Sequence, residues 1–332
     1  MGGAVAHPIP PRGEDCRGKD AGHASSGHCL FKQLAKFQVS HPLLLFKCSE
    51  LIFTARWNIG GYDSKWTPTA VMNAVKTLPL LESLELIVGN FNSAGLQLQS
   101  LRNLQSVKIS ARDNDYFINI IEPLSRLIAK SPNLHTFHLG STYSPAASFH
   151  HLLRNCPPNL VLPLKHLGLQ GVSLKLDSIT LPHLHRLTSL TLHDYKTSKS
   201  TLDGAFVDKA ERLHPDAIWA ILKTTNVHLN GIDVNHISTT LLDYISSYSG
   251  LKKLRLARID LRTQERSDLA NQFYDLCLGK HTSSLEELIV TPAYEGGWCL
   301  VDKALVVISL CKKLRILEGS LVSAALDDAV VS

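Results

Sequence analysis

The sequence predicts an α/β protein whose single parallel sheet is built strand by strand from successive repeats. Two observations carry this prediction: the pattern Leu-x-x-Leu-x-Leu recurs along most of the 332 residues, and the stretches between its copies have apolar residues at helical spacing. The second and third apolar positions of the pattern lie two residues apart, so in a strand they share one face. A unit of one strand and one helix cannot bury that face alone and must stack on its neighbours.

The copies differ in quality. The clear ones are Leu81-x-x-Leu84-x-Leu86, Leu104-x-x-Val107-x-Ile109, Leu134-x-x-Phe137-x-Leu139, Leu164-x-x-Leu167-x-Leu169, Leu187-x-x-Leu190-x-Leu192, Leu251-x-x-Leu254-x-Leu256 and Leu285-x-x-Leu288-x-Val290. Poorer copies are Leu34-x-x-Phe37-x-Val39 at the start, Leu229-x-x-Ile232-x-Val234 in the middle and Leu314-x-x-Leu317 with Gly319 at the end. This pattern is typical of leucine-rich repeats. We therefore expect an irregular leucine-rich-repeat solenoid, with a parallel concave sheet and with helices and loops on the convex side.

Helices are expected between the strands. Thr67-Pro68 opens one, and the others are expected at 115–129, 145–154, 215–224, 239–247, 267–278 and 302–310. The repeats vary from 23 residues, between Leu81 and Leu104, to 34 residues, between Leu251 and Leu285. Long units have room for a full helix, whereas short units have room for a turn or a brief 3₁₀ segment.

The domain organisation follows from where the pattern runs. Residues 1–29 are rich in Gly, Pro, His and charge and lack periodicity, so we expect a disordered segment. Residues 30–322 form the expected solenoid, interrupted by a long polar loop at about 193–214, and residues 323–332 form a C-terminal tail.

Composition argues against several classes of function. The net charge is +5, and the Lys and Arg residues are scattered, so we expect no nucleic-acid partner. No apolar run is long enough to cross a bilayer, and the start of the chain has no apolar signal region, which favours the cytoplasm or nucleus. The seven cysteines form no CxxC pair and are interpreted as reduced thiols.

Three segments have sequences more specific than a generic repeat: Ile218-Trp219-Ala220-Ile221-Leu222, the run from Leu241 to Leu251, and Ala293-Tyr294-Glu295-Gly296-Gly297-Trp298. These sequences resemble a large group of leucine-rich-repeat proteins of mushroom-forming fungi, many of which begin with an F-box. The resemblance covers about residues 31–322. It implies the substrate-recognition part of a ubiquitin-ligase receptor, with the ligase adaptor as a partner. The Leu-Pro-x-Glu start and helical pattern of an F-box do not occur in residues 1–60.

The sequence gives little evidence for a metal site or a catalytic site. His183 with His185, and the neighbouring His150 and His151, suggest a metal, but no third ligand stands at a repeated spacing, so surface or turn histidines are the favoured interpretation. A nucleophilic set of Cys156, His166 and Asp177 can be assembled only by free choice. We predict no catalytic residue, metal or cofactor, and an enzyme with an unrecognised site is a distant alternative.

The residues that alternate with the buried leucines should point out of the concave sheet face. The predicted protein-binding residues on that face are Glu85, Lys108, His138, His166, Thr191, Lys253, Arg255 and Glu287. Tyr294 and Trp298 are a separate possible hot spot, since aromatics beside glycines anchor interfaces, although Trp298 could equally cap the last repeats. The predicted function is non-enzymatic binding of a protein partner that the sequence does not name. A solvated face without a partner is the alternative.

Overall fold

The computed structural model describes residues 50–55, 73, 75–78, 80–88, 97–111, 114–141, 148–193, 215–259 and 265–321. The chain divides into the units Met1–Leu45 and Phe46–Ser332, and all described residues belong to the second. The expected disordered segment 1–29, the first repeat copy at Leu34, loop residues 194–214 and the tail 323–332 lie outside the described residues.

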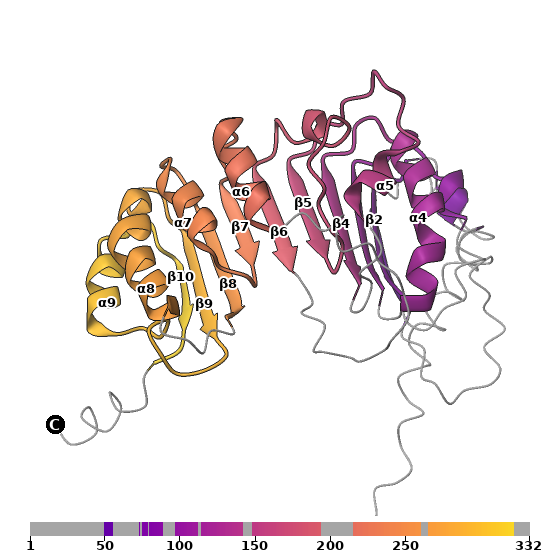
Figure 1. Ribbon diagram of the computed structural model, residues 1–332. Coiled ribbons are helices and arrows are strands. Elements are labelled where there is room, and N and C mark those ends of the chain that lie inside the picture. Colours follow the sequence, from indigo (N-terminus) through magenta and orange to yellow (C-terminus); the bar gives the residue numbers. More distant parts are fainter. Residues whose placement is uncertain are drawn as a thin grey trace, which may run out of the picture. The chain divides into compact units, whose positions relative to one another are not determined.

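Ten strands form one sheet (Figure 1). They are β1 Glu50–Ala55, β2 Ser83–Val88, β3 Ser106–Ala111, β4 Thr136–Ser141, β5 His166–Gln170, β6 Ser189–His193, β7 Gly231–Val234, β8 Lys253–Ile259, β9 Glu287–Pro292 and β10 Ile316–Gly319. Each strand pairs in parallel with the next strand of the sequence, so the spatial order is the chain order from β1 to β10. The sheet is open, because β1 and β10 are its two edges. The predicted α/β class and parallel sheet are confirmed.

The connections carry the helices. The α-helices are α4 Asn114–Ala129, α5 Phe149–Leu153, α6 Pro215–Thr224, α7 Thr239–Ser246, α8 Glu265–Gln272 and α9 Asp302–Ser309. Short helical turns are η3 Leu98–Ser100, η4 Leu181–His183, the π-helical η6 Phe273–Cys277 and η7 Leu278–His281. The short units after β2 and β5 have 3₁₀ turns where longer units have α-helices, as their lengths predict.

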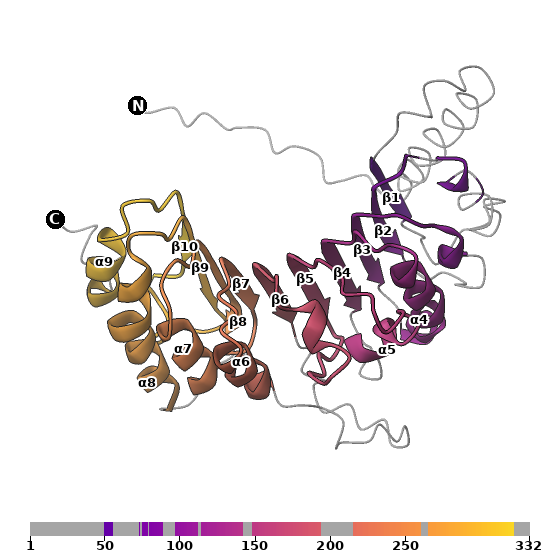
Figure 2. The same cartoon turned by 90° about the horizontal axis from the view of Figure 1, so that it is seen from above.

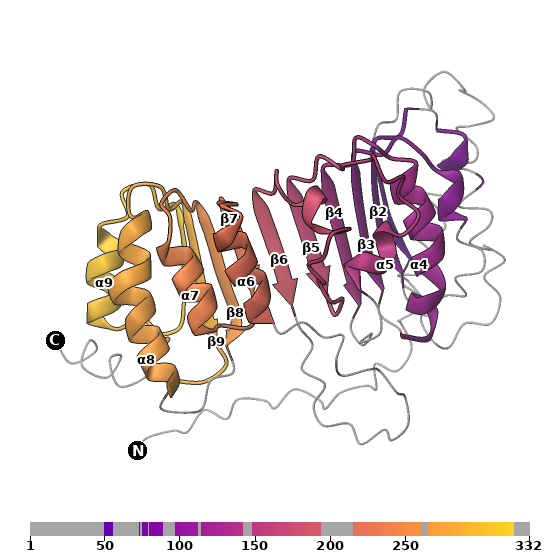
Figure 3. The same ribbon diagram turned by 45° about the horizontal axis from the view of Figure 1, so that its top comes forward.

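The helices lie on one face of the sheet (Figures 2 and 3). Neighbouring helices such as α6 and α7 also pack on each other. We call the opposite sheet face the open face. None of the described helices is both long enough and apolar enough to cross a membrane.

The core lies between the sheet and the helices. The central apolar position of the pattern forms one column across the strands, because the register places these residues side by side. The column consists of Leu84, Val107, Phe137, Leu167, Leu190, Ile232, Leu254 and Leu288, each at most 2% exposed. This confirms the register assigned from the sequence.

The same backbone contact recurs at the entry to each strand from β3 to β10. One carbonyl of the preceding unit accepts two N–H groups, from the first residue of the strand and from the residue before it. The accepting carbonyls belong to Glu82, Gln105, His135, Lys165, Thr188, Asn230, Lys252 and Glu286. Identical backbone bonding in units of unequal length shows that the strand segment is the invariant part of each unit.

Buried polar side chains close the core beneath the strand segments. The backbone N–H groups of Leu104, Leu229 and Leu251 donate to Ser131 Oγ at 3.2 Å, Tyr244 Oη at 3.1 Å and His281 Nδ1 at 3.2 Å. A buried N–H without an acceptor costs free energy, and each of these side chains supplies that acceptor from within or just after the helical segment later in the same unit.

Several predicted helix boundaries agree with the structure, whereas one predicted helix is interrupted and one strand was not predicted. Helix 215–224 is confirmed exactly, and helices 115–129, 239–247 and 302–310 agree within one residue. The helix expected at 267–278 is interrupted, because α8 gives way to η6 at Phe273. β1 was not predicted. Its register aligns Leu51 with Leu84 and Phe53 with Leu86, so Cys48-x-x-Leu51-x-Phe53 is a copy of the pattern with Cys as its first residue.

Candidate functional site: the open face of the sheet

Three columns of outward residues run across the open face, because parallel strands in matched register bring equivalent positions together. The first column contains Ser83, Ser106, Thr136, His166, Ser189, Gly231, Lys253 and Glu287. The second contains Glu85, Lys108, His138, Gly168, Thr191, Asp233, Arg255 and Ile289. The third includes Ser110, Gly140, Gln170 and His193.

All eight residues predicted from the repeats therefore lie on one surface. His166, Lys253 and Glu287 belong to the first column and Glu85, Lys108, His138, Thr191 and Arg255 to the second. The surface is polar and accessible: Lys108, His166, Lys253 and Arg255 are exposed, and the other four are partly exposed.

At the β2–β3 end, Lys108 and Glu85 form an ion pair, with Nζ and Oε2 3.5 Å apart. Their side chains are 49% and 32% exposed, so water screens the pair and its contribution to stability is small. Each charge can therefore turn to a partner at little cost.

At the centre, the imidazole of His138 lies directly over Gly168 of the next strand. A Cβ atom at residue 168 would stand 2.1 Å from His138 Nδ1, so only glycine leaves room for this ring. The pKa of His138 lies below its ordinary value, because burial disfavours the charged ring and because His193 and Lys108 repel a proton, while Asp233 and Glu85 oppose the shift. His138 is therefore a neutral ring at neutral pH.

Beside His138, the side chains of His193 and Asp233 meet, with Nε2 and Oδ1 2.7 Å apart. Both side chains are about three-quarters buried. Neither residue was predicted: His193 was assigned to the long loop, and the outward position of the Leu229 copy was not considered. The position of Asp233 between Ile232 and Val234 is the signal that could have identified it.

At the β8–β9 end, Lys253 Nζ lies 3.7 Å from Glu287 Oε2. Arg255 is exposed and, among the described residues, forms no ion pair with an acidic side chain. Ile289, its neighbour in the second column, is only 6% exposed. Among the described residues, Arg255 thus presents an exposed and unpaired positive charge on this part of the face.

Only one of the two residues of the predicted aromatic hot spot, Tyr294 and Trp298, is exposed. Tyr294 is 49% exposed, whereas Trp298 is 3% exposed and packs against Phe273 and Tyr274 at ring-centroid distances of 5.6 and 6.4 Å. The burial of Trp298 removes it from the surface hot spot and agrees with the alternative that it caps the last repeats. Aromatics beside glycines occur in buried corners as well as on surfaces, so sequence could not separate the two.

The residues considered for chemistry have structural surroundings. His183 is not a surface histidine: it is 5% exposed, and its Nδ1 accepts the N–H of Leu162 at 2.9 Å. Asp177 pairs with His150, at 2.5 Å, and not with His166. Burial raises the pKa of Cys156 to about 11, which keeps it a thiol at neutral pH. Within the described ranges, no group of three or more His, Cys, Asp or Glu side chains could hold a metal.

Comparison with known proteins adds no relative. No protein-family model matches the chain, and no curated protein is significantly similar to it.

Proposed function

We propose that the chain is a leucine-rich-repeat solenoid that binds a protein partner on the open face and has no catalytic role. The single observation that carries this proposal is the pair of mostly polar columns in matched register from β2 to β9, with a shorter third column from β3 to β6. A sheet needs one apolar face to fold, and that requirement is met by the face under the helices. The other face presents a continuous surface on rigid strands, which suits recognition.

The repeated backbone contact supports the repeat class. Eight successive carbonyls each accept two N–H groups at strand entry, and the strand order equals the chain order. Both features are expected when each unit buries its apolar face only against its neighbours.

The charges on the open face favour a partner of mixed charge. Lys108 with Glu85 and Lys253 with Glu287 form two weak ion pairs, and His193 contacts Asp233 between them. A partner would exchange these weak pairs for contacts of its own, and Arg255 would gain a first one. Such exchange gives selectivity more than affinity, because a wrong partner leaves several charges unmatched.

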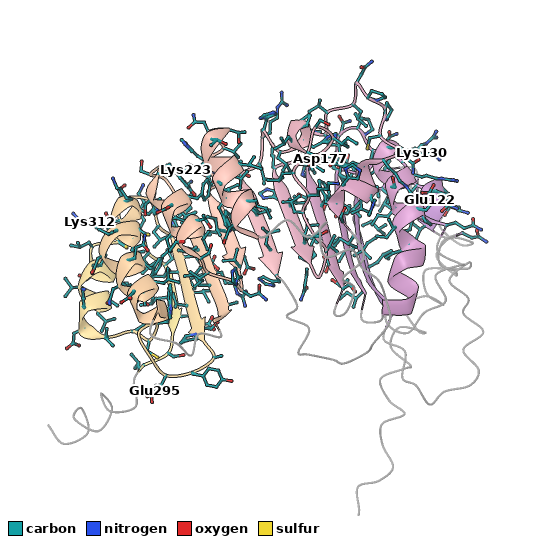
Figure 4. All side chains as sticks on the ribbon, viewed as in Figure 1. Glu122, Lys130, Asp177, Lys223, Glu295 and Lys312 are labelled. Carbon is teal, nitrogen blue, oxygen red and sulfur yellow. The ribbon has the colours of Figure 1, made fainter. Side chains whose placement is uncertain are left out.

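Site-specific cross-linking tests the surface. A photo-cross-linking residue at Thr191 lies at the centre of the open face, whereas the same residue at Lys223 of α6 lies on the helix side; Figure 4 labels Lys223. In native cells we expect one protein to be captured from Thr191 and not from Lys223. Equal capture from both positions, or capture from Lys223 alone, contradicts the open face as the binding surface.

A narrower version of the proposal makes the chain the substrate-recognition part of an F-box-type ubiquitin-ligase receptor. It rests on the sequences of residues 218–222, 241–251 and 293–298, which resemble those of fungal F-box leucine-rich-repeat proteins, and on the partner that this resemblance implies. Purification of the tagged protein from native cells, scored for ligase subunits, separates the versions. A partner captured through Thr191 without any ligase subunit supports the general proposal and contradicts the narrower one.

A further inference from the structure

The C-terminal end of the sheet exposes an apolar surface. Seven of the large apolar side chains that are exposed in the described residues lie between positions 301 and 321, on α9, β10 and their flanks. They are Val301, Leu305, Val306, Leu310, Ile316, Leu317 and Leu321, each 40% to 64% exposed. We call this surface the end face. Exposed apolar patches of this kind mark interaction sites on folded proteins.

The strand of the end face has a free edge. β10 pairs with β9 along one side, and no described strand pairs with its other side. Leu317 occupies the apolar column that continues from Leu254 and Leu288, yet it is 43% exposed where those two are at most 1% exposed. A free edge with uncovered apolar side chains is a template for another strand.

The helix of the end face has an uncovered apolar stripe. Ala304 and Ile308 of α9 are buried, whereas Val306 and Leu310 are 64% and 58% exposed. Residues four apart share one side of a helix, so Val306 and Leu310 form an exposed stripe at the end of α9, the helix that leads into β10. An occupant that covers both this stripe and the free edge of β10 must present a helix and a strand together.

The charges of the end face are divided between its two edges. α9 ends and β10 begins at one edge, where Lys312, Lys313 and Arg315 are exposed. α9 begins and β10 ends at the opposite edge, where Asp302 and Glu318 are exposed and the exposed Lys303 is already paired with Asp275 of η6. Figure 4 shows Lys312 at the first of these edges and labels Glu295, in the turn after β9, at the other. None of the five charges forms an ion pair with another described residue.

We propose that the end face binds the end face of a second copy of this chain, with the two β10 strands antiparallel and the two α9 helices adjacent. A two-fold axis normal to the sheet reverses the strand direction and keeps the helices of both copies on one side. It places the basic edge of each copy against the acidic edge of the other. Strand, helix and charge are then matched by a single operation.

The composition of the end face suits such a dimer. Seven apolar side chains with five charges at two opposite edges resemble the apolar core and polar rim of a protein–protein interface. Head-to-tail pairing of β10 with β1 would instead align the strands in parallel and build open polymers.

The first test is the mass of the full chain in sedimentation equilibrium at micromolar concentration. We expect twice 36.6 kDa. Val306→Glu with Leu310→Glu should shift the mass to the monomer, while Leu276→Glu, at a 61% exposed apolar residue outside the end face, should leave the dimer intact. A monomeric wild-type chain, or a mass that keeps growing with concentration, overturns the proposal.

Reversing the charges at each edge of the end face tests the antiparallel arrangement of the two copies. Lys312→Glu with Lys313→Glu gives a chain acidic at both edges, and Asp302→Lys with Glu318→Lys gives one basic at both. Each variant alone should weaken self-association at least tenfold, and an equimolar mixture should form heterodimers as readily as wild type forms homodimers. If the mixture stays monomeric, the antiparallel arrangement is wrong.

One further variant excludes the remaining occupant. A chain ending at Leu321 lacks residues 322–332, which include Leu326, Val330, Val331 and the acidic Asp327 and Asp328. We expect it to dimerise like the full chain. If the truncated chain dimerises and the full chain does not, the chain's own last residues cover the end face and the proposal fails.

Discussion

Leu254 and Leu288 are the last two residues of the buried apolar column and are at most 1% exposed. Replacing either residue by Ala should lower the free energy of unfolding by about 2–5 kcal/mol, from lost transfer energy and the cavity left behind. Leu276→Ala is the control, because this leucine is 61% exposed and lies outside the end face. Urea unfolding measures all three. Equal losses at Leu254 and Leu276 would contradict the described burial of the column.

His281 gives the protein a pH dependence. It is 1% exposed, and the pKa of its ring lies below the ordinary value because burial disfavours the charged form; the Ile245 carbonyl opposes this shift and Lys280 adds to it. In the unfolded chain a histidine titrates near pH 6.5. Above that pH neither state is protonated, and below it the unfolded chain binds the proton first, so stability falls as the pH falls.

The variant His281→Asn isolates this effect, because its amide oxygen can still accept the N–H of Leu251. The free energy of unfolding should fall between about pH 7.5 and about pH 5.5 in both proteins, since His183 and His138 also have lowered pKa values. The fall should be smaller in the variant. A fall of the same size would show that His281 is protonated equally in the folded and unfolded chain.

The His138 ring on β4 can occupy its position only because the next strand, β5, has glycine at residue 168. In Gly168→Ala the new Cβ collides with the His138 ring, which must leave its place at a cost of about 1–3 kcal/mol. Removing the ring as well, in His138→Ser with Gly168→Ala, should recover most of that loss, because contacting residues are not additive. Gly279→Ala, whose Cβ would meet nothing within 4 Å, is the control. Additive losses in the double variant would contradict the described contact.

Elements with a strong local signal were predictable. The column from Leu84 to Leu288 followed from the spacing of the leucines, and helix 215–224 followed from its proline start and apolar spacing. β1 was missed because its pattern begins with Cys48. The break between α8 and η6 was missed because both halves have helical spacing, whereas η6 also packs on α7 and α9, contacts that local spacing does not show.

For the candidate site, the sequence predicted which side chains point out of the sheet but not which of them contact one another. Period-two alternation placed eight predicted residues on the open face. The pair of His193 and Asp233 joins residues 40 positions apart, and a repeat pattern says nothing about such a specific contact. The burial of Trp298 depends likewise on Phe273 and Tyr274, which belong to another unit.

On the scale of the whole molecule, the two faces of the parallel sheet separate the residues that stabilise the fold from those of the proposed binding surface. The helix side supplies the buried column, and the open face supplies polar side chains whose replacement should cost little stability. Exposed charges on strands held by the core can therefore change without unfolding the chain. This separation predicts that binding and stability respond to different substitutions.

The most direct measurement of the central claim is the affinity of the partner captured through Thr191 for the variant Lys253→Glu with Arg255→Glu. Both residues are exposed on β8, and reversing their charge opposes any partner that contacts them. We expect Kd to rise at least tenfold, which is about 1.4 kcal/mol, with unchanged unfolding. The control reverses the exposed Lys223 and Arg186, which lie outside the open face, and should bind like wild type. Unchanged affinity in the folded β8 variant would contradict the open face as the binding surface.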